Sequence, residues 1–145
     1  MESCSPMEKL RPYSQSLDRL RNAGLRPTRQ RLALANLLFD GNDRHVTAEI
    51  LHGEALSANV RVSLATVYNT LHQFNEVGLL REIVVDSGRS YFDTNVSEHH
   101  HIFNEDNREL MDICPDQISF TGLPVIEKGQ EVSRVDVIVR VKNNN

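Results

Sequence analysis

The sequence has few of the features that mark several large classes of protein. Among its 145 residues there are only two cysteines, Cys4 and Cys114, and no Cys-x-x-Cys pair, so we expect no cysteine-clamped zinc site. No run of about 18 apolar residues occurs, so we expect no membrane-spanning helix. The N-terminus lacks a charged segment followed by an apolar one, which predicts a cytoplasmic protein.

The net charge of −4 is distributed unevenly along the chain. Residues 1–31 carry seven Lys or Arg against three acids, whereas residues 93–145 carry five basic and ten acidic side chains. A basic first part and an acidic last part are typical of a DNA-binding module joined to a module that handles cations.

The spacing of apolar residues predicts four helices in the first half of the chain. They span Ser14–Ala23, Arg29–Phe39, Thr47–Ser57 and Leu64–Val77. In the last helix the apolar side chains form a stripe for the core, which consists of Leu64, Val67, Leu71, Phe74 and Val77. The opposite face carries small hydrogen-bonding groups, one aromatic ring and almost no charge: Ala65, Thr66, Tyr68, Asn69, His72 and Gln73.

A β-hairpin is predicted directly after these helices. Its strands, Leu80–Val85 and Ser90–Asp93, flank the loop Asp86–Arg89. Helices followed by a hairpin predict a winged helix-turn-helix, with the third and fourth helices as the helix-turn-helix pair. We therefore assign residues 1–94 to a winged-helix DNA-binding domain, with residues 1–12 expected to be disordered.

Residues 95–142 form a second predicted domain. Its predicted strands are His99–Asn104, Glu109–Cys114 and Ser133–Val141, and Val125–Gly129 is expected to be a short helical stretch. A domain of this size buries too little surface to be stable alone, which predicts dimerisation. The expected fold class is therefore α+β, with an N-terminal winged helix-turn-helix domain and a small C-terminal α/β dimerisation domain.

Three consecutive histidines in this second domain indicate a metal site. Successive side chains of a strand point to opposite faces, so His99 and His101 share one face, and Glu98 and His100 share the other. Two imidazoles on one rigid face form half of a site for a transition metal. The alternatives are an exposed polar strand without a ligand, and a sensor of pH.

Four stretches of the sequence, in order and with matching spacing, resemble the ferric uptake regulator (Fur) family of bacterial metal-responsive repressors. They are Ala23–Thr28 (AGLRPT), His45–Glu49 (HVTAE), Ala65–Leu71 (ATVYNTL) and Tyr91–Asp93 (YFD) followed by the histidines. The missing Cys-x-x-Cys pair and the triple histidine look most like the iron response regulator (Irr) branch. This resemblance implies a response to iron or haem status.

The resemblance also implies which residues contact double-stranded operator DNA. In the family, the tyrosine that matches Tyr68 packs on thymines, and the basic residue that matches Arg26 enters the minor groove. Asn69 stands where an arginine is common, which favours adenine over guanine. We also expect base contacts from Thr66 and phosphate contacts from the nearby arginines, Arg29 and Arg31. Alternatively, Tyr68 is an aromatic at the edge of the core, and the two arginines only solvate their helix.

The same resemblance implies a regulatory metal site made of His45, Asp93, His99 and His101. Nitrogen and oxygen ligands suit Fe²⁺, Mn²⁺ or Zn²⁺, and the ligand set alone does not choose between them. The opposite face carries Glu98 and His100, but no histidine follows His101, so a second site there is expected to be absent or incomplete.

Haem is the other ligand that the resemblance implies. The imidazoles of His99, His100 and His101 could bind its iron, and Cys114, which precedes a proline, could supply a thiolate. The competing interpretation of Cys114 is a small core residue at the end of a strand.

Together these features predict a cytoplasmic, homodimeric transcriptional regulator of iron or haem homeostasis, which binds operator DNA and is gated by metal or haem; the sequence does not decide between repressor and activator. The first alternative keeps the fold but makes the protein a peroxide or manganese sensor. The remote alternative is a metal-dependent hydrolase. We expect no enzymatic activity, because nothing in the sequence marks a substrate pocket.

Overall fold

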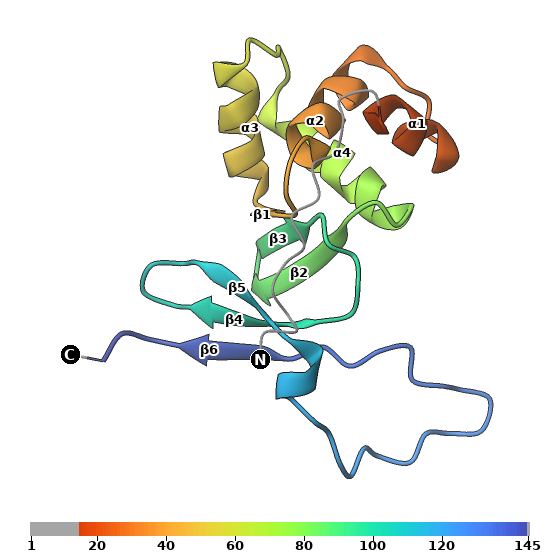
Figure 1. Ribbon diagram of the computed structural model, residues 1–145, viewed down its shortest axis with the longest axis vertical. Helices are drawn as coiled ribbons and strands as arrows, with labels where there is room; N and C mark the ends of the chain where they lie inside the picture. Colours follow the sequence, from red (N-terminus) through yellow and green to blue (C-terminus); the bar gives the residue numbers. More distant parts are fainter. Residues whose placement is uncertain (1–14, 145) are drawn as a thin grey trace. The chain divides into compact units, whose positions relative to one another are not determined.

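Two units make up the described part of the chain, residues 15–144, in the computed structural model (Figure 1). One ends at Val96 and the other begins at Ser97. The predicted disorder of residues 1–12 lies outside the described residues. Within residues 15–144, no helix is both long enough and apolar enough to cross a bilayer.

The N-terminal unit contains the four predicted helices, which the structure confirms. They are α1 (Gln15–Asn22), α2 (Arg29–Phe39), α3 (Ala48–Ser57) and α4 (Leu64–Glu76). Hydroxyl side chains set three of the four helix starts: Thr28, Thr47 and Ser63 each accept a backbone N–H from three residues ahead, at 3.1–3.2 Å. Short polar caps therefore fix where the helices of the helix-turn-helix begin.

The core of this unit lies between the helices and one face of the following sheet. Its fully or almost fully buried members are Leu20, Leu34, Ala35, Leu38, Phe39, Val46, Ala48, Leu51, Ala55, Val67, Leu71, Phe74, Leu80 and Phe92. The predicted stripe of α4 is only partly correct, because Leu64 and Val77 at the two ends of the helix are 40% and 38% exposed. Thr70 is buried beside Leu71 instead.

The sheet of the N-terminal unit has three antiparallel strands in the order β1-β3-β2. Strands β2 (Arg81–Asp86) and β3 (Arg89–Asp93) are the predicted wing hairpin, but a bulge between Val84 and Asp86 shortens the turn. Gly88 in this turn has a φ of +75°, a conformation that favours glycine. The third strand, β1 (His45–Val46), has only two residues and was not predicted.

The C-terminal unit is a three-stranded sheet in the order β5-β4-β6. Strand β4 (His100–Asn104) pairs antiparallel with β5 (Leu110–Ile113) and parallel with β6 (Ile138–Val141). A single 3₁₀ turn, η1 (Pro115–Gln117), follows β5. With helices in the first unit and small sheets in both, the described chain has the predicted α+β fold.

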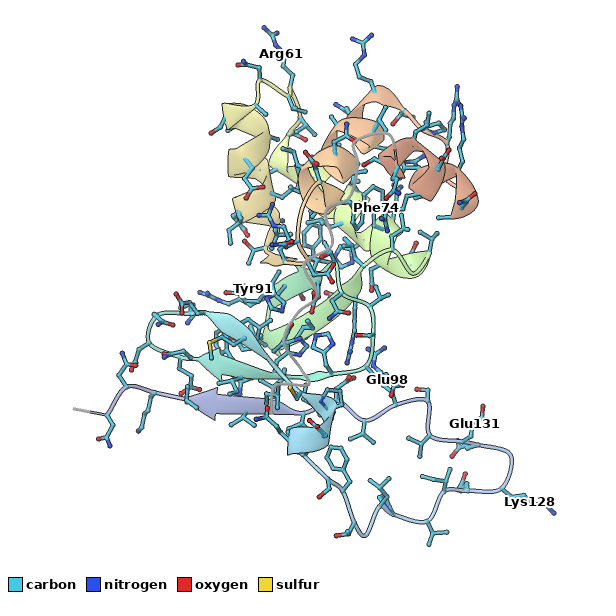
Figure 2. All side chains as sticks on the ribbon, in the orientation of Figure 1. Arg61, Phe74, Tyr91, Glu98, Lys128 and Glu131 are labelled. Carbon is cyan, nitrogen blue, oxygen red and sulfur yellow. The ribbon has the colours of Figure 1, made fainter. Side chains whose placement is uncertain are left out.

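Two predictions for the C-terminal unit are wrong. The stretch Val125–Gly129 is not helical, and the last strand begins at Ile138 instead of Ser133. Gly129, the last residue of this stretch, has a positive φ, as does Gly122 before it, and a residue in that conformation cannot continue a right-handed helix. The whole segment 118–137 is extended and irregular, and the side chains of Lys128 and Glu131 project away from it (Figure 2).

Candidate metal centre and nucleic-acid interface

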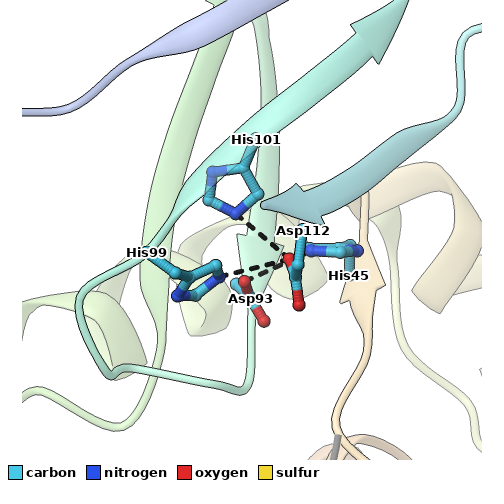
Figure 3. A group of neighbouring side chains, drawn as sticks. All are labelled: His45, Asp93, His99, His101 and Asp112. Atoms are coloured by element: carbon cyan, nitrogen blue, oxygen red, sulfur yellow. Dashed lines mark ion pairs between the residues drawn. The ribbon is translucent and has the colours of Figure 1, made fainter. Parts of the chain in front are cut away.

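In the C-terminal unit, two histidines and an aspartate converge on one point. Asp112 on β5 is the direct cross-strand partner of His101 on β4. Its Oδ1 atom lies 3.2 Å from Nε2 of His99 and 3.4 Å from Nε2 of His101 (Figure 3). The two rings are neighbours, with centroids 4.5 Å apart. One potential ligand atom from each of the three residues therefore lies within 4.8 Å of the others.

The ring of His99 is oriented by the backbone of Ser97. Its Nδ1 atom lies 2.7 Å from the carbonyl oxygen of Ser97, and a carbonyl only accepts, so Nδ1 carries the hydrogen. In the neutral ring, Nε2 then presents a lone pair toward the Asp112 oxygen. Either a proton on Nε2 or a metal ion bound by both atoms would remove the repulsion between them, and a second-shell bond such as that to Ser97 is typical of metal-ligating histidine.

The spacing of these atoms fits a small divalent ion. Ligand atoms bound at about 2.0–2.1 Å in a tetrahedral arrangement lie roughly 3.4 Å apart. The two distances from Asp112 Oδ1 are 3.2 and 3.4 Å. A nitrogen and oxygen donor set of this kind suits Fe²⁺, Mn²⁺ or Zn²⁺.

In the N-terminal unit, the two other predicted ligands also form a cross-strand pair. His45 on β1 is the register partner of Asp93 on β3. His45 Nε2 lies 3.2 Å from Asp93 Oδ2, and the Asp93 side chain is buried. The backbone N–H of Asn95 donates to the other carboxylate oxygen of Asp93 at 2.9 Å. The carboxylate is therefore held in one orientation, with one oxygen toward the imidazole.

Thr94 fastens the short strand β1 beside this pair. Its hydroxyl oxygen accepts the backbone N–H of Arg44 at 2.9 Å, and its own backbone N–H donates to the Arg44 carbonyl at 3.0 Å. The hydroxyl also lies 3.2 Å from a carboxylate oxygen of Asp43, to which it donates. Arg44 in turn forms an ion pair with Glu54 on α3 and donates to the carbonyl of Leu37 on α2. His45 is thus attached to the helices through its neighbour.

On the opposite face of β4, the side chain of His100 makes structural contacts within the C-terminal unit. His100 Nδ1 accepts the backbone N–H of Val137 at 3.1 Å, and the ring meets Phe120 edge-on with centroids 5.4 Å apart. His100 therefore binds β4 to both ends of the segment 118–137. Glu98 is exposed, and the structure does not pair it with His100 in a second cluster among the described residues.

The structure gives little support to the residues that were predicted to bind haem iron. His99 and His101 face Asp112, and His100 already accepts a backbone N–H through Nδ1. Cys114 lies just after β5 and is half-buried instead of a core residue.

The predicted DNA-contacting residues lie on both sides of α4. Along one side runs a polar groove formed with the start of α2 and the loop before it. It is lined by Arg26, Thr28, Gln30, Arg31, Thr66, Asn69, Thr70 and Gln73. This groove brings together four of the six predicted residues. Arg29 is exposed on the same turn of α2 but does not line the groove.

Tyr68 lines a different groove, between α4, the start of α3 and the wing. Its side chain is 50% exposed, so about half of its surface is open to a ligand. The groove also includes Arg89, Ser90 and Tyr91 of the wing. The ring of His72 packs edge-on against that of Tyr68, with ring centroids 4.4 Å apart. On its other side His72 packs edge-on against Phe92 of β3, with centroids 5.3 Å apart. An exposed phenol supported by an aromatic stack can face a ligand without collapsing onto the helix.

Sequence reasoning missed Asp112 and the wing residues. Asp112 could have been found, because it and His101 are equidistant from the centre of the predicted turn Glu105–Arg108. A tight antiparallel hairpin pairs such positions. The pairing of His45 with Asp93 has no comparable signal, since β1 has two residues and its partner strand is more than 40 positions away.

Comparisons with known proteins agree with one another. The model of the ferric uptake regulator family matches residues 22–140. The ferric uptake regulation protein of Bordetella parapertussis is 36% identical over 81 residues, which are 56% of this chain and 58% of that protein. The peroxide-responsive repressor PerR of Staphylococcus aureus is 34% identical over 106 residues, which are 72% of this chain and 70% of that protein.

A similar solved structure is that of the ferric uptake regulator from Pseudomonas aeruginosa with manganese. It has a TM-score of 0.69 and 26% sequence identity, and the match covers 90% of this chain and 98% of that one. The regulator from Vibrio cholerae, at 24% identity and the same TM-score, has the same fold.

Proposed function

The chain belongs to the ferric uptake regulator family, and from this premise we propose that it is a dimeric, metal-responsive regulator of transcription that binds operator DNA. One divalent ion would be bound by His45, Asp93, His99 and His101, with Asp112 as a fifth ligand that the sequence prediction lacked. We assign DNA binding to residues 1–94 and dimerisation to residues 95–142. Binding to chromosomal DNA implies a cytoplasmic location.

The observation that carries this proposal is the repeated cross-strand pairing of histidine with aspartate. His101 faces Asp112 within one unit, and His45 faces Asp93 within the other. In both pairs an imidazole Nε2 lies 3.2–3.4 Å from a carboxylate oxygen. Histidines on a regular strand that share carboxylate partners and a backbone-fixed tautomer favour metal binding over an exposed polar strand.

The metal would act on DNA binding by joining the two halves of its ligand set. Asp93 ends β3 and His99 precedes β4, so only residues 94–98 lie between the halves. The metal supplies a positive centre that offsets the repulsion between the lone pairs and carboxylates. This chain's own residues fix the donors: Ser97 orients His99, Asn95 orients Asp93, and Thr94 holds the strand of His45. Fixing these parts would fix the distance between the recognition helices of a dimer.

DNA reading is assigned to α4 and its surroundings. Tyr68, Asn69 and Thr66 would face base edges in the major groove, and Arg26 would enter the adjacent minor groove. Arg29, exposed on the first turn of α2, would contact a phosphate. The exposed position of Tyr68 and the polar groove beside it support this assignment.

The decisive experiment selects double-stranded DNA from a random pool with the full-length protein, in parallel with Mn²⁺, Fe²⁺, Zn²⁺, haem or a chelator. We expect an enriched sequence with one of the divalent metals and none with the chelator. Enrichment that is equal in all conditions would refute metal gating, and no enrichment in any condition would refute operator binding.

Two carboxylates on the same strand region provide a matched pair of variants. Asp112→Ala should lower the metal affinity by roughly 100-fold or more, because loss of an outer-shell partner alone typically costs 10- to 100-fold. Glu109→Ala removes an exposed carboxylate near the same hairpin turn and should leave the metal affinity unchanged. Equal effects of the two substitutions would remove Asp112 from the ligand set.

A peroxide sensor is the second candidate function. The relative that supports it is the peroxide-responsive repressor of Staphylococcus aureus, 34% identical over 106 residues. In this case hydrogen peroxide should abolish DNA binding by the Fe²⁺-loaded protein, with a mass increase of one oxygen atom on the peptide that contains His99 and His101. Unchanged binding and mass after peroxide treatment would exclude it.

A haem-responsive function, as implied by the resemblance to the iron response regulator branch, stays a prediction. It requires haem to release the selected DNA when the bound metal is kept constant. If haem leaves DNA binding unchanged while one of the metals promotes it, the protein is a metal sensor without haem control.

A further inference from the structure

The guanidinium group of Arg31 connects three parts of the DNA-binding unit. Its Nε and Nη2 atoms both donate to the side-chain oxygen of Gln73 on α4, at 3.3 and 3.1 Å. Its Nη1 atom donates to the backbone carbonyl of Arg26 at 3.0 Å. Arg31 itself lies on the first turn of α2, so one side chain joins α2, α4 and the loop that carries Arg26.

Neighbouring contacts attach the same turn of α2 at two further points. The hydroxyl of Thr28 caps the helix by accepting the backbone N–H of Arg31 at 3.2 Å. The side-chain amide of Gln30 donates to the carbonyl of Arg61, just before α4, at 3.2 Å. The first turn of α2 is therefore held against both the start and the third turn of α4. In contrast, the side chain of Arg61 extends outward from its loop (Figure 2).

These contacts give Arg31 a different environment from Arg29. Arg29 is exposed, whereas the bonds from Arg31 to Gln73 are part-buried. A guanidinium group has five N–H donors in a fixed fork, and at least one N–H on each of its three nitrogens is directed at the protein. Three of the five N–H donors are therefore used within the protein, and a bidentate phosphate contact that needs the Nε edge of the guanidinium would have to break the bonds to Gln73.

We propose that Arg31 is a positioning residue that sets the place of Arg26 relative to the recognition helix, and that it does not itself bind a phosphate. This inference rests on the proposed function, because it concerns how two DNA-contacting elements are held together. Arg26 and Tyr68 would enter different grooves of the same duplex, whose separation is fixed. The loop must therefore be held at one distance from α4, and the fork from Arg31 to Gln73 and Arg26 provides that restraint.

The test measures affinity for the selected operator against salt concentration for single and double variants of the full-length, metal-loaded protein. Arg31→Ala should weaken binding about as much as Arg26→Ala, roughly tenfold. Each substitution should also reduce the steepness of the plot of log affinity against log salt concentration, here called the salt slope, by about 0.9. In the double variant, the second substitution should add almost nothing to either value. Additive losses, with a slope lowered by about 1.8, would show that each arginine contacts the DNA independently and would overturn the proposal.

Arg31→Lys separates the two roles more sharply. Lysine keeps the charge and binds phosphate well, but it has no planar fork that can reach Gln73 and the Arg26 carbonyl together. We expect Arg31→Lys to behave like Arg31→Ala. Wild-type affinity in the lysine variant would contradict a positioning role.

Gln73→Ala gives an independent variant that changes no charge, and it also serves if the Arg31 variants fold poorly. It should lower the salt slope as Arg26→Ala does, although the substitution removes only a neutral amide. The matched control is Arg29→Ala, whose effect should add fully to that of Arg31→Ala. If the wild-type protein selects no DNA at all, the proposed function fails, and this outcome differs from every result that bears on Arg31.

Discussion

His45 and Asp93 face each other directly across strands β1 and β3, with 3.2 Å between Nε2 of the imidazole and Oδ2 of the carboxylate. The strand that carries His45 has only two residues, so its position depends on the few bonds around it. Asp93 is also the register partner of Arg81 on its other side. Asp93 therefore lies on the central strand of the small sheet and His45 on an edge strand, so a change in β1 should move the imidazole more than the carboxylate.

Replacing His45 with alanine should lower metal affinity by roughly 100-fold or more, since it removes a proposed ligand far from the other histidines in sequence. The measurement is a titration of the metal-free protein with Mn²⁺ or Zn²⁺. The control is His52→Ala on α3, whose ring contacts the Val62 carbonyl instead. Unchanged metal binding by the His45 variant would remove this residue from the site.

Replacing Thr94 with valine should both destabilise the protein and weaken metal binding. Valine has a similar shape but no hydroxyl, so the N–H of Arg44 loses its 2.9 Å partner, at a cost of about 1–3 kcal/mol. Thr94→Ser keeps the hydroxyl and should restore most of both properties. Thermal unfolding and a metal titration measure the two effects. A serine variant as impaired as the valine variant would indicate that the methyl group matters, not the hydrogen bonds.

Replacing Tyr68 with alanine should reduce discrimination between operator and random DNA by about 1–3 kcal/mol. The phenol is exposed beside the wing, where it can reach base edges. Tyr68→Phe keeps the ring and its contact with His72, so it separates the hydroxyl from the aromatic surface. Binding to both DNAs is measured at one salt concentration. An equal loss on both would show that Tyr68 reads no bases.

Replacing Phe74 with alanine should destabilise the N-terminal unit by about 3–5 kcal/mol, because it leaves a cavity between α4 and α2. Phe74 is fully buried, and its ring lies 6.4 Å from that of Phe39. Leu64→Ala on the same helix should cost about 1 kcal/mol or less, since Leu64 is 40% exposed. Denaturant unfolding compares the two, and similar losses would mean that the buried face of α4 has been misidentified.

The helices were predictable because local signals mark both of their ends. Thr28, Thr47 and Ser63 act as caps in the structure, each accepting the expected backbone N–H. The wing was predictable to within one residue for the same reason, although the bulge after Val84 shifts its register. A bulge depends on how the strand must twist over the core, which no short stretch of sequence determines.

The segment 118–137 shows where local signals fail. Val125–Gly129 suggested a helix and Ser133–Val141 a long strand, but only Ile138–Val141 pairs. Pairing of β6 depends on β4, more than 30 residues earlier, and alternating valines do not specify how many positions find a partner. For the site, same-face placement of His99 and His101 followed from strand geometry. The proposal that His45 and Asp93 belong to the same site came from the resemblance to the family.

The strand β6 ends its sheet, because the order is β5-β4-β6. Its outer row of backbone N–H and C=O groups forms an open edge among the described strands, and Val139 and Val141 on it are 39% and 36% exposed. Backbone hydrogen bonds at such an edge do not depend on side chains, so the edge can pair with any extended chain, including a misfolded copy. On heating, aggregation should therefore begin at this edge, and the melting temperature of the native protein should rise with protein concentration if copies cover this edge of one another.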